Sequence, residues 1–441
     1  MQQPLTWPDL AELRVGVYGL GVEGRANVRA CRALGVAPVL VDDRAQDDPE
    51  VLVTARGGLD ALSACDVVVV SPGISIYSAA VEALRARGVR VAGGLGLWLA
   101  GADRSRVIAV TGTKGKSTTA AFTGHLLTAW GHRCGVGGNI GAAPWDPEIG
   151  DDYDFWVVEV SSYQATGAEV APPVVVVTSL NPDHLPWHRG DVETYYRDKL
   201  SLCTRPGARV TVANGDSPEL TQRAALLGPT VRWVTDADAA REPWTDAVPL
   251  LGRHNRRNAV LAATALREAG FPEASDAEAL REAGASFEPL EHRLTLVATV
   301  DGVRFVDDGL ATNVLPTIAA LESFPGERIA LIVGGQDRGI DYRPLGAHLR
   351  ESGARVLVLA IPQVGARIAA EVGESLAGTR AATRECSDLA QAVAAGFEWA
   401  RPGGIVLLSP AAPSFGDFKD YKERSDAFAA AAGGLRGPAR R

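Results

Sequence analysis

The chain has 441 residues, of which 46% are hydrophobic and 22% are charged. This balance is typical of globular protein and excludes collagen-like, disordered and disulfide-scaffold classes. The length predicts two to four domains, at roughly 100–200 residues each. A net charge of −9 disfavours a nucleic-acid binder. Five scattered cysteines without a CxxC pair fit a reducing compartment and argue against a structural zinc site. The start lacks a signal-peptide pattern and no segment is apolar for ~18 residues, so we expect a cytoplasmic protein without membrane insertion.

Short apolar runs rich in β-branched residues predict strands that are buried on both faces of parallel sheets. In chain order these runs are 15–18, 38–41, 67–70, 107–110, 156–160, 174–178, 209–212, 329–333, 356–359 and 405–408. Helix-like stretches lie between several of them, at 79–87, 118–130, 258–269 and 389–400. Alternation of strands and helices predicts an α/β fold.

The last third of the chain begins differently. Apolar runs at 294–300 and 303–307 flank the dipeptide Asp301-Gly302, which favours a tight hairpin turn. We therefore expect a β-hairpin that opens a new domain. With a second boundary in the polar stretch 101–105, the predicted domains are residues 1–104, 105–292 and 293–441.

The strand at 107–110 runs into a Gly-rich turn and then a helix-like stretch. Backbone N–H groups of such a turn can hold phosphates at a helix N-terminus. Lys116 would reach the β- and γ-phosphates, and the hydroxyl of Ser117 would bind Mg²⁺. The usual first glycine of the motif is missing, because position 110 is Val. The alternative is a solvated, Lys-rich turn without a ligand.

The first strand leads into Gly19-x-Gly21-x-x-Gly24, and Asp42 ends the next strand. This pattern indicates a Rossmann-like unit and does not by itself identify the nucleotide. The segment 71–74 closes the third strand at its carboxyl end, where ligands of open α/β sheets gather. A tight turn without a ligand is the alternative there.

Acidic and histidine side chains follow two further strands. Glu159 ends one strand beside the phosphate loop, and oxygen ligands of this kind suit Mg²⁺. His184 and His188 follow the strand at 174–178 and could supply one metal or phosphate contact, but a third zinc-type ligand is missing. A turn or cap role is the alternative for each residue. Lys199 lies in a predicted amphipathic helix, and spacing gives no reason to choose it over Arg197.

These motifs together resemble the Mur ligases, ATP-dependent amide-forming enzymes of peptidoglycan synthesis, over nearly the whole chain. The markers, in order, are TGTKGKSTT (111–119), NIG (139–141), EVSSYQ (159–164), NPDHLPWH (181–188), YYRDK (195–199), GRHNRRNAVLAA (252–263), LEHRL (290–294), DDGLATN (307–313), GGQDRGIDY (334–342) and SPAAPSFGDFKDY (409–421). Within the family, the GLGxxG start and the SPGI turn are most similar to the branch that adds glutamate to UDP-N-acetylmuramoyl-L-alanine.

The resemblance implies a three-domain α/β fold. A Rossmann-like N-terminal domain would bind the UDP-sugar, a central P-loop ATPase-type domain would bind ATP, and a Rossmann-like C-terminal domain would bring glutamate. It also implies an acyl phosphate intermediate, which the amine of glutamate attacks. We expect small-molecule substrates, Mg²⁺, no nucleic acid, a monomer, and a separate epimerase as a functional partner.

The resemblance also assigns roles to matching residues. The implied catalytic residues are Lys116, Lys199, His184 and Glu159. The implied metal ligands are Ser117, Glu159, His184 and Lys199, the last as a carbamate. The implied ATP-binding residues are Gly112, Thr113, Lys114, Gly115, Lys116, Ser117, Thr118, Asn255, Asn258, Arg293 and Asp308. The implied UDP-muramoyl residues are Val22, Glu23, Asp42, Arg44, Ser71 and Asn139, and the implied glutamate residues are Thr312, Arg338, Ser414 and Tyr421.

The sequence departs from the usual D-glutamate-adding pattern where glutamate is expected to bind. Leu310 and Arg338 each replace a lysine, and Gly416 replaces an aspartate. Arg and Lys are not equivalent, because Arg favours a planar bidentate grip. These changes resemble a branch that adds L-glutamate, which we favour; the alternative is a divergent D-glutamate ligase.

Three other classes fit less of the chain. A folate polyglutamate ligase would share the central domain but not the GLGxxG first domain. An NAD-dependent oxidoreductase would explain residues 19–24 but not the phosphate loop or Lys199. A non-catalytic binding module would be expected to lose Lys116, Glu159 or Lys199, and all three are present.

Overall fold

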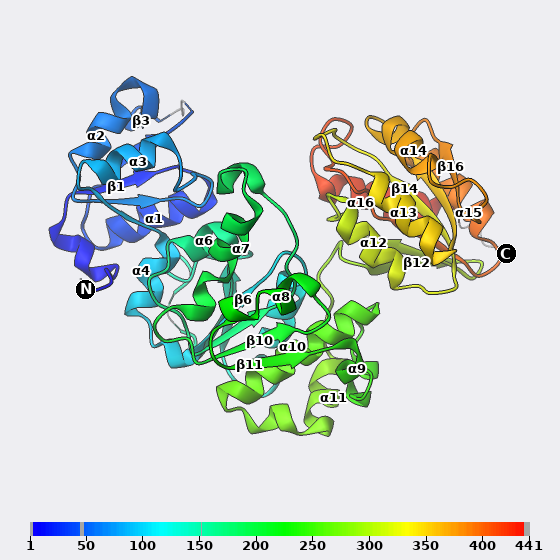
Figure 1. Cartoon of the computed structure of the whole chain (residues 1–441), viewed down its shortest axis with the longest axis horizontal. Coiled ribbons are helices and arrows are strands. Elements are labelled where there is room, and N and C mark those ends of the chain that lie inside the picture. Colours follow the sequence, from blue (N-terminus) through cyan, green and yellow to red (C-terminus); the bar gives the residue numbers. More distant parts are fainter. Residues whose placement is uncertain (1–2, 45–47, 151, 436–441) are drawn as a thin grey trace. The chain divides into compact units, whose positions relative to one another are not determined.

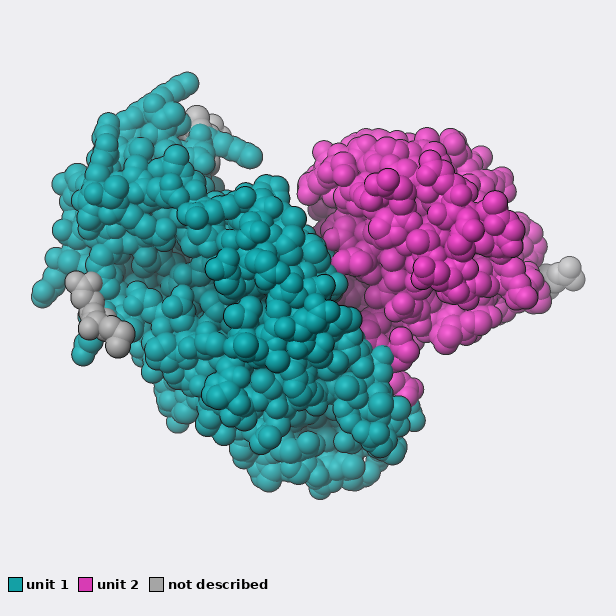
Figure 2. Space-filling model, viewed as in Figure 1, with its two compact units in different colours: residues 1–248, 257–287 teal, residues 249–256, 288–441 magenta. Residues whose placement is uncertain are grey.

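The structure is a computed structural model that describes residues 3–44, 48–150 and 152–435. The described residues form two compact units (Figures 1 and 2). Unit 1 comprises residues 1–248 and 257–287, and unit 2 comprises residues 249–256 and 288–441. Three separate sheets confirm the predicted α/β fold class, two of them in unit 1 and one in unit 2. The division into three domains at residues 104 and 292 stays a prediction.

The first sheet of unit 1 is entirely parallel, with strand order β3-β2-β1-β4-β5. Its strands are β1 (Val15–Tyr18), β2 (Val39–Asp42), β3 (Val51–Val53), β4 (Val67–Val70) and β5 (Arg90–Ala92). The helices that accompany it are α1 (Val22–Ala33), α2 (Leu59–Ser63), α3 (Ala79–Ala86) and α4 (Gly94–Gly101). Because β2 and β4 lie on opposite sides of β1, the loops after β1 and β4 flank a crevice where ligands of such sheets bind.

The second sheet of unit 1 is also parallel, with strand order β11-β10-β9-β6-β8-β7. Its strands are β6 (Val107–Thr111), β7 (Cys134–Gly138), β8 (Phe155–Glu159), β9 (Val174–Val177), β10 (Val210–Asn214) and β11 (Val231–Val234). Its helices are α5 (Lys116–Ala129), α6 (Ser162–Thr166), α7 (Val192–Leu200), α8 (Pro218–Gln222), α9 (Asp236–Ala239), α10 (Arg253–Ala269) and α11 (Ala277–Ala285). The central strands β6, β8 and β9 are neighbours, so the segments that follow them meet at one edge of the sheet.

The two sheets of unit 1 share one hydrophobic core. This core includes Leu10 and Val15 near the first sheet, together with Val158 and Tyr195 of the second. Trp145 packs in the same core, and its indole N–H donates to the side-chain oxygen of Asn27 on α1 at 2.8 Å. The first two sheets are therefore joined by side-chain packing as well as by the chain.

The sheet of unit 2 begins with the predicted hairpin. Asp301 and Gly302 both have positive φ angles, 47° and 79°, as a tight turn of this kind requires. The strands are β12 (Thr295–Val300), β13 (Val303–Asp307), β14 (Arg328–Val333), β15 (Arg355–Ala360), β16 (Ala382–Glu385) and β17 (Ile405–Leu408). Only the β12–β13 pair is antiparallel in the order β12-β13-β17-β14-β15-β16.

Helices cover both faces of this sheet, and alternate residues of the strands point to opposite faces. In β14, Leu331 packs in one core cluster and Ile332 in the other. The first cluster includes α12, α13 and α14, and the second includes α15 and α16. The helices are α12 (Val314–Glu322), α13 (Arg343–Ser352), α14 (Gly365–Gly373), α15 (Leu389–Ala400) and α16 (Tyr421–Gly434). This double cover explains why the strands read as continuous apolar runs.

Short helical turns occupy several connections in the described part of the chain. They are η1 (Pro8–Glu12), η2 (Thr54–Gly58), η3 (Arg104–Arg106), η4 (Leu185–His188), η5 (Ser201–Thr204), η6 (Ala224–Leu227), η7 (Pro243–Ala247) and η8 (Pro272–Ser275). None of the described helices combines the length and the apolar character needed to span a bilayer.

Close packing of α4 against the end of α6 generates a stability prediction. A Cβ atom at Gly96 would lie 2.0 Å from the carbonyl oxygen of Gly167. Alanine normally favours a helix over glycine by up to ~1 kcal/mol, but here the backbones would have to separate. We expect Gly96→Ala to lower the free energy of unfolding by about 1–3 kcal/mol, measured by urea unfolding followed by circular dichroism.

The matched control is Gly433→Ala in α16, where a Cβ would meet no atom within 4 Å. This variant should be neutral or slightly stabilised. Equal stability of the Gly96→Ala variant and the parent protein would contradict the packing argument.

Candidate functional site

The phosphate loop follows β6 and leads directly into α5, which begins at Lys116. Gly112 and Gly115 have positive φ angles of 133° and 89°. A Cβ at Gly112 would also lie 2.2 Å from the hydroxyl oxygen of Thr178, so glycine is required there by space and by conformation. The amine of Lys116 donates to the carbonyl oxygen of Thr113 at 3.2 Å. The loop thus has the backbone shape and the cation that a phosphate site needs.

Lys199 lies beneath this loop and is only 3% exposed. Its Nζ donates to the carbonyl oxygen of Gly112 at 3.0 Å and lies 5.0 Å from the ring centre of Tyr195. Burial lowers the pKa of Lys199 well below its usual value, and the charge of nearby Lys116 lowers it further. The contact singles out Lys199 rather than Arg197, which is exposed on the same helix.

Glu159 is 1% exposed at the end of β8. Its Oε1 atom accepts a hydrogen bond from the side-chain amide of Asn139 at 2.7 Å, whereas its Oε2 atom is buried without a hydrogen-bond partner among the described residues. A buried carboxylate oxygen without a donor costs free energy, and a hard cation would satisfy it. Among the described residues, no group of three His, Cys, Asp or Glu side chains is placed to hold a metal ion without other ligands.

Asp183 and His184 follow β9 on the same side of the sheet. Lys114 of the phosphate loop forms an ion pair with Asp183 at 3.3 Å. His184 has a positive φ of 52°, and 56% of its side chain is exposed. Burial lowers its pKa, while the charge of Asp183 acts in the opposite direction. A mostly neutral imidazole with an accessible edge can serve as a metal ligand.

His188 is placed differently from the sequence hypothesis of a metal or phosphate contact. It is completely buried, its Nδ1 lies 2.6 Å from a carboxylate oxygen of Asp198, and its Nε2 lies 3.0 Å from Oγ of Ser162. Tyr77 also donates to Asp198 at 2.8 Å. Both ring nitrogens are used, so His188 positions α6 and α7 and is not available as a ligand. The sequence contained no signal for this chain of contacts.

Several residues of the predicted UDP-muramoyl set lie around the turn after β1. The backbone N–H groups of Leu20 and Arg44 donate to the two carboxylate oxygens of Asp42, at 2.7 and 2.9 Å. Ser71 donates to the carbonyl oxygen of Gly19 at 2.5 Å, which ties together the two loops of the crevice. Val22 is 86% exposed at the start of α1. Asp42 and Ser71 therefore shape the crevice, and Val22 lies on its surface.

Glu23 connects the two sheets of unit 1. Its carboxylate accepts a hydrogen bond from the side-chain amide of Gln164 on α6 at 2.8 Å. Loss of hydration raises the pKa of this half-buried carboxyl to about 7, and the Gln164 bond only partly offsets the rise. Arg85 and Glu169 line the same small cavity.

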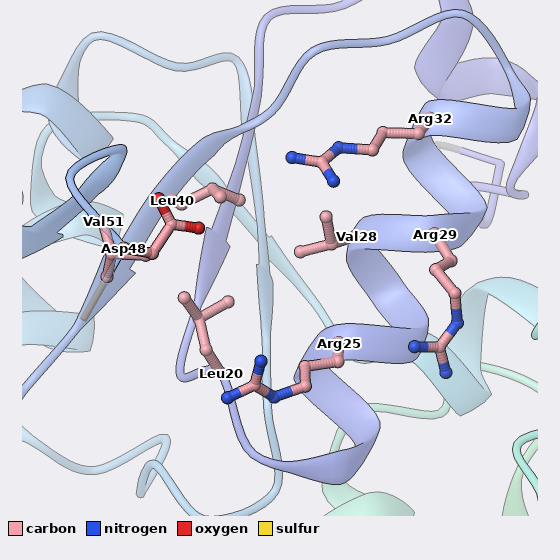
Figure 3. A pocket seen from close by; sticks show the side chains of 8 residues that line it. All are labelled: Leu20, Arg25, Val28, Arg29, Arg32, Leu40, Asp48 and Val51. Atoms are coloured by element: carbon pink, nitrogen blue, oxygen red, sulfur yellow. The ribbon is translucent and has the colours of Figure 1, made fainter. Parts of the chain in front are cut away.

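A second cavity, beside the first sheet of unit 1, has a volume of about 510 Å³ (Figure 3). It lies between α1 and the strands β2 and β3, with an apolar floor that includes Leu20 and Leu40 and with arginines of α1 around it. Arg29 forms an ion pair with Asp146, and Arg32 lies 3.6 Å from Glu50. Much of the basic charge around this cavity is therefore already neutralised.

The remaining predicted nucleotide residues are divided between the units. Asn258 belongs to unit 1, where its side-chain amide lies 3.1 Å from the position of a Cβ at Gly115. Asn255, Arg293 and Asp308 belong to unit 2. Asp308 accepts a hydrogen bond from Ser409 at 2.7 Å, and burial raises its pKa to about 7. That these two sets meet at one nucleotide stays a prediction.

The predicted glutamate residues all lie in unit 2. Ser414 is buried, Arg338 and Thr312 are exposed, and Tyr421 begins α16. The guanidinium of Arg338 lies 5.9 Å from the ring centre of Phe415, next to Ser414. Thr312, Arg338 and Ser414 belong to the loops that follow β13, β14 and β17, at the carboxyl ends of these strands, and Tyr421 begins the helix after the last of these loops.

Comparison with known families gives three matches in chain order. Residues 13–93 match the MurD-like N-terminal domain of Mur ligases, residues 110–245 the Mur ligase middle domain, and residues 292–412 the Mur ligase glutamate ligase domain. Together they span most of both units.

Curated relatives match almost the full length of the chain. A protein of a Micromonospora strain, named UDP-N-acetylmuramoyl-L-alanine–L-glutamate ligase, is 41% identical over 96% of this chain and 97% of its own. Proteins of the same name from Salinispora tropica and Xanthomonas campestris are 39% and 37% identical, over 96% and 95% of this chain and 98% and 95% of theirs.

Solved structures share the fold at low sequence identity. The UDP-N-acetylmuramate-alanine ligase MurC of Thermotoga maritima has a TM-score of 0.54 at 17% identity, covering 96% of this chain and all of that one. The MurF ligase of the same organism, solved with ADP, has a TM-score of 0.54 at 16% identity, covering 99% and 100%. The fold is thus that of three-sheet α/β ligases. At 41% identity over nearly its whole length, the chain belongs to the Mur ligase family.

The buried carboxyl of Glu23 generates a pH prediction. Its pKa is about 7 in the folded state and 4.5 in its usual environment, so the folded state holds this proton more tightly. The stability of unit 1 should therefore fall as pH rises from about 4.5 to 7 and then level off. Glu23→Gln retains an acceptor for Gln164, and we expect it to reduce this fall by about 1–2 kcal/mol.

Denaturant unfolding at pH 5 and pH 8 measures the effect, with Glu12→Gln at an exposed position as the control. Parallel pH profiles for Glu23→Gln and the parent protein would exclude Glu23 as the source.

Proposed function

We propose that this chain is an ATP-dependent ligase that joins glutamate to UDP-N-acetylmuramoyl-L-alanine, a step of peptidoglycan precursor synthesis. The observation that carries the proposal is the placement of the buried Lys199 amine on the carbonyl of Gly112, directly under a phosphate-type loop. The names of relatives that cover 95% or more of the chain support the same substrates.

The chemistry begins with a poor acyl donor. ATP phosphorylates the alanyl carboxylate, the amine of glutamate attacks the acyl phosphate, and phosphate leaves through a tetrahedral intermediate. The N–H groups of the loop and the Lys116 cation would hold and neutralise the transferred phosphoryl group. The incoming amine must be deprotonated and shielded from water.

Mg²⁺ fits the donor set, because Glu159 has a buried oxygen without a hydrogen-bond partner among the described residues. Ser117, Glu159, His184 and a carbamylated Lys199 would hold it. When bound, it supplies positive charge to the phosphates. In carbamylation, the lone pair of the neutral Lys199 amine attacks the carbon of CO₂ and the π electrons of one C=O bond move to its oxygen. The nitrogen gives one proton to water, which leaves a carbamate anion.

On the substrate side, Val22, Glu23, Asp42, Arg44, Ser71 and Asn139 are proposed to form the UDP-muramoyl site. Thr312, Arg338, Ser414 and Tyr421 are proposed to bind glutamate. We favour L-glutamate, because Leu310, Arg338 and Gly416 depart from the D-glutamate pattern and the relatives carry L-glutamate in their names. The enzyme would work as a cytoplasmic monomer, and an epimerase would act on its product.

The function is tested with UDP-N-acetylmuramoyl-L-alanine, ATP and each enantiomer of glutamate in separate reactions. We expect a product heavier by one glutamyl residue, with at least tenfold faster turnover of L-glutamate, measured by mass spectrometry and phosphate release. Lys116→Ala, which removes the loop cation, should abolish both signals. Turnover of D-glutamate alone would exclude the L-glutamate assignment, and unchanged phosphate release by Lys116→Ala would exclude the ATP site.

Carbamylation of Lys199 has its own test. Removal of CO₂ at mildly acidic pH should reduce turnover several-fold, and bicarbonate should restore it, because the carbamate forms and decays reversibly. Lys199→Arg cannot form the carbamate, so bicarbonate should have no effect on its residual turnover. Turnover of the parent protein that is insensitive to CO₂ would contradict carbamylation.

A further inference from the structure

The sheet of unit 2 has a topological switch beside β14. The chain proceeds from β14 to β15 and β16 on one side and then returns to β17 on the other side. The loops after β14 and β17 therefore flank a crevice at the carboxyl edge, where ligands of open α/β sheets bind. The loop after β13 ends at the same edge. These three loops carry the proposed glutamate residues Arg338, Ser414 and Thr312.

One side chain forms hydrogen bonds to all three loops. Arg424 on α16 is fully buried, and its guanidinium donates to carbonyl oxygens of Gly309, Gly334 and Ala412, at 2.9, 3.2 and 3.2 Å. Each carbonyl belongs to a different loop, after β13, β14 and β17 respectively. A planar guanidinium can reach three acceptors in this way, whereas an ammonium group on a lysine stem cannot match the same fork.

Burial disfavours the charged form of Arg424. Burial lowers its pKa to about 10, and the carboxylate of Asp307 acts in the opposite direction. Asp307 in turn accepts hydrogen bonds from the N–H of Gly309 at 2.8 Å and from the hydroxyl of Ser425 at 3.0 Å. The loop after β13 is thus held by Arg424 through its carbonyl and by Asp307 through its N–H.

We propose that Arg424 is the positioning residue of the amino-acid site: by holding these three carbonyls, it fixes the relative placement of the loops that bind glutamate. The inference rests on the proposed function and adds to it a residue that does not itself touch the substrate. A fully buried cation that serves only stability could be replaced by apolar packing at little cost. A cation that bridges three loops instead sets the geometry of the crevice between them.

The test compares Arg424→Met and Arg424→Lys with the control Arg328→Met. Arg328 also donates to two backbone carbonyls, those of Trp399 and Arg401. It lies at the start of β14, so it is at the end of the sheet away from the three loops. Two activities are measured: the KM for glutamate in complete turnover, and ATP-dependent trapping of the acyl phosphate by hydroxylamine as a hydroxamate, which needs no glutamate.

We expect Arg424→Met to raise the KM for glutamate at least tenfold and Arg424→Lys to raise it less. Both should lose much less hydroxamate formation than complete turnover. Arg328→Met should lower the melting temperature without changing the KM for glutamate. If Arg424→Met does not fold, the KM of Arg424→Lys decides.

A KM for glutamate that stays at the parent value in the folded variants would overturn the inference. An equal loss of hydroxamate formation and complete turnover would also overturn it, because a general structural role would then suffice. Absence of ATP-dependent hydroxamate in the parent protein would instead remove the proposed function, and this inference with it.

Discussion

Burial of one amine under the phosphate loop is the constraint on which the candidate site depends. Lys199 is held on the carbonyl of Gly112, and the hydroxyl of Tyr195 lies 3.0 Å from that of Thr113, so two polar contacts fix α7 to the loop. A buried cation is unfavourable unless it loses its charge or gains a counter-charge, and a second lysine nearby increases the cost. The loop therefore holds an amine with a lowered pKa beneath the proposed phosphate position. A Gly-rich turn without α7 beneath it would not hold an amine at this position.

Apolar runs in the sequence predict the central strands of the three sheets but miss most of the strands at the sheet edges. Strands such as Val67–Val70 are buried on both faces and appear as unbroken apolar runs. The five strands that these runs miss, β3, β5, β7, β11 and β16, all lie at the edge of a sheet. An edge strand has a neighbour on one side only, so polar sequences such as Ala382–Glu385 and Gly-rich sequences such as Cys134–Gly138 suffice.

Parts of the candidate site that lie in consecutive residues could be predicted from the sequence, whereas contacts between distant residues could not. The phosphate loop is encoded in consecutive residues, and its glycines and lysine could be identified from their order. The choice of Lys199 over Arg197 could not be made from spacing, because it depends on which side of α7 is covered. The contacts of His188 and Arg424 join residues far apart in the chain, and local patterns contain no information about them.

The shared core of unit 1 has a consequence for how the protein unfolds. Described side chains of its two sheets belong to one hydrophobic cluster. Cooperativity follows packing and not the number of sheets. The two sheets of unit 1 should therefore unfold together, as one cooperative unit. A ligand that binds at one of these sheets would accordingly stabilise both.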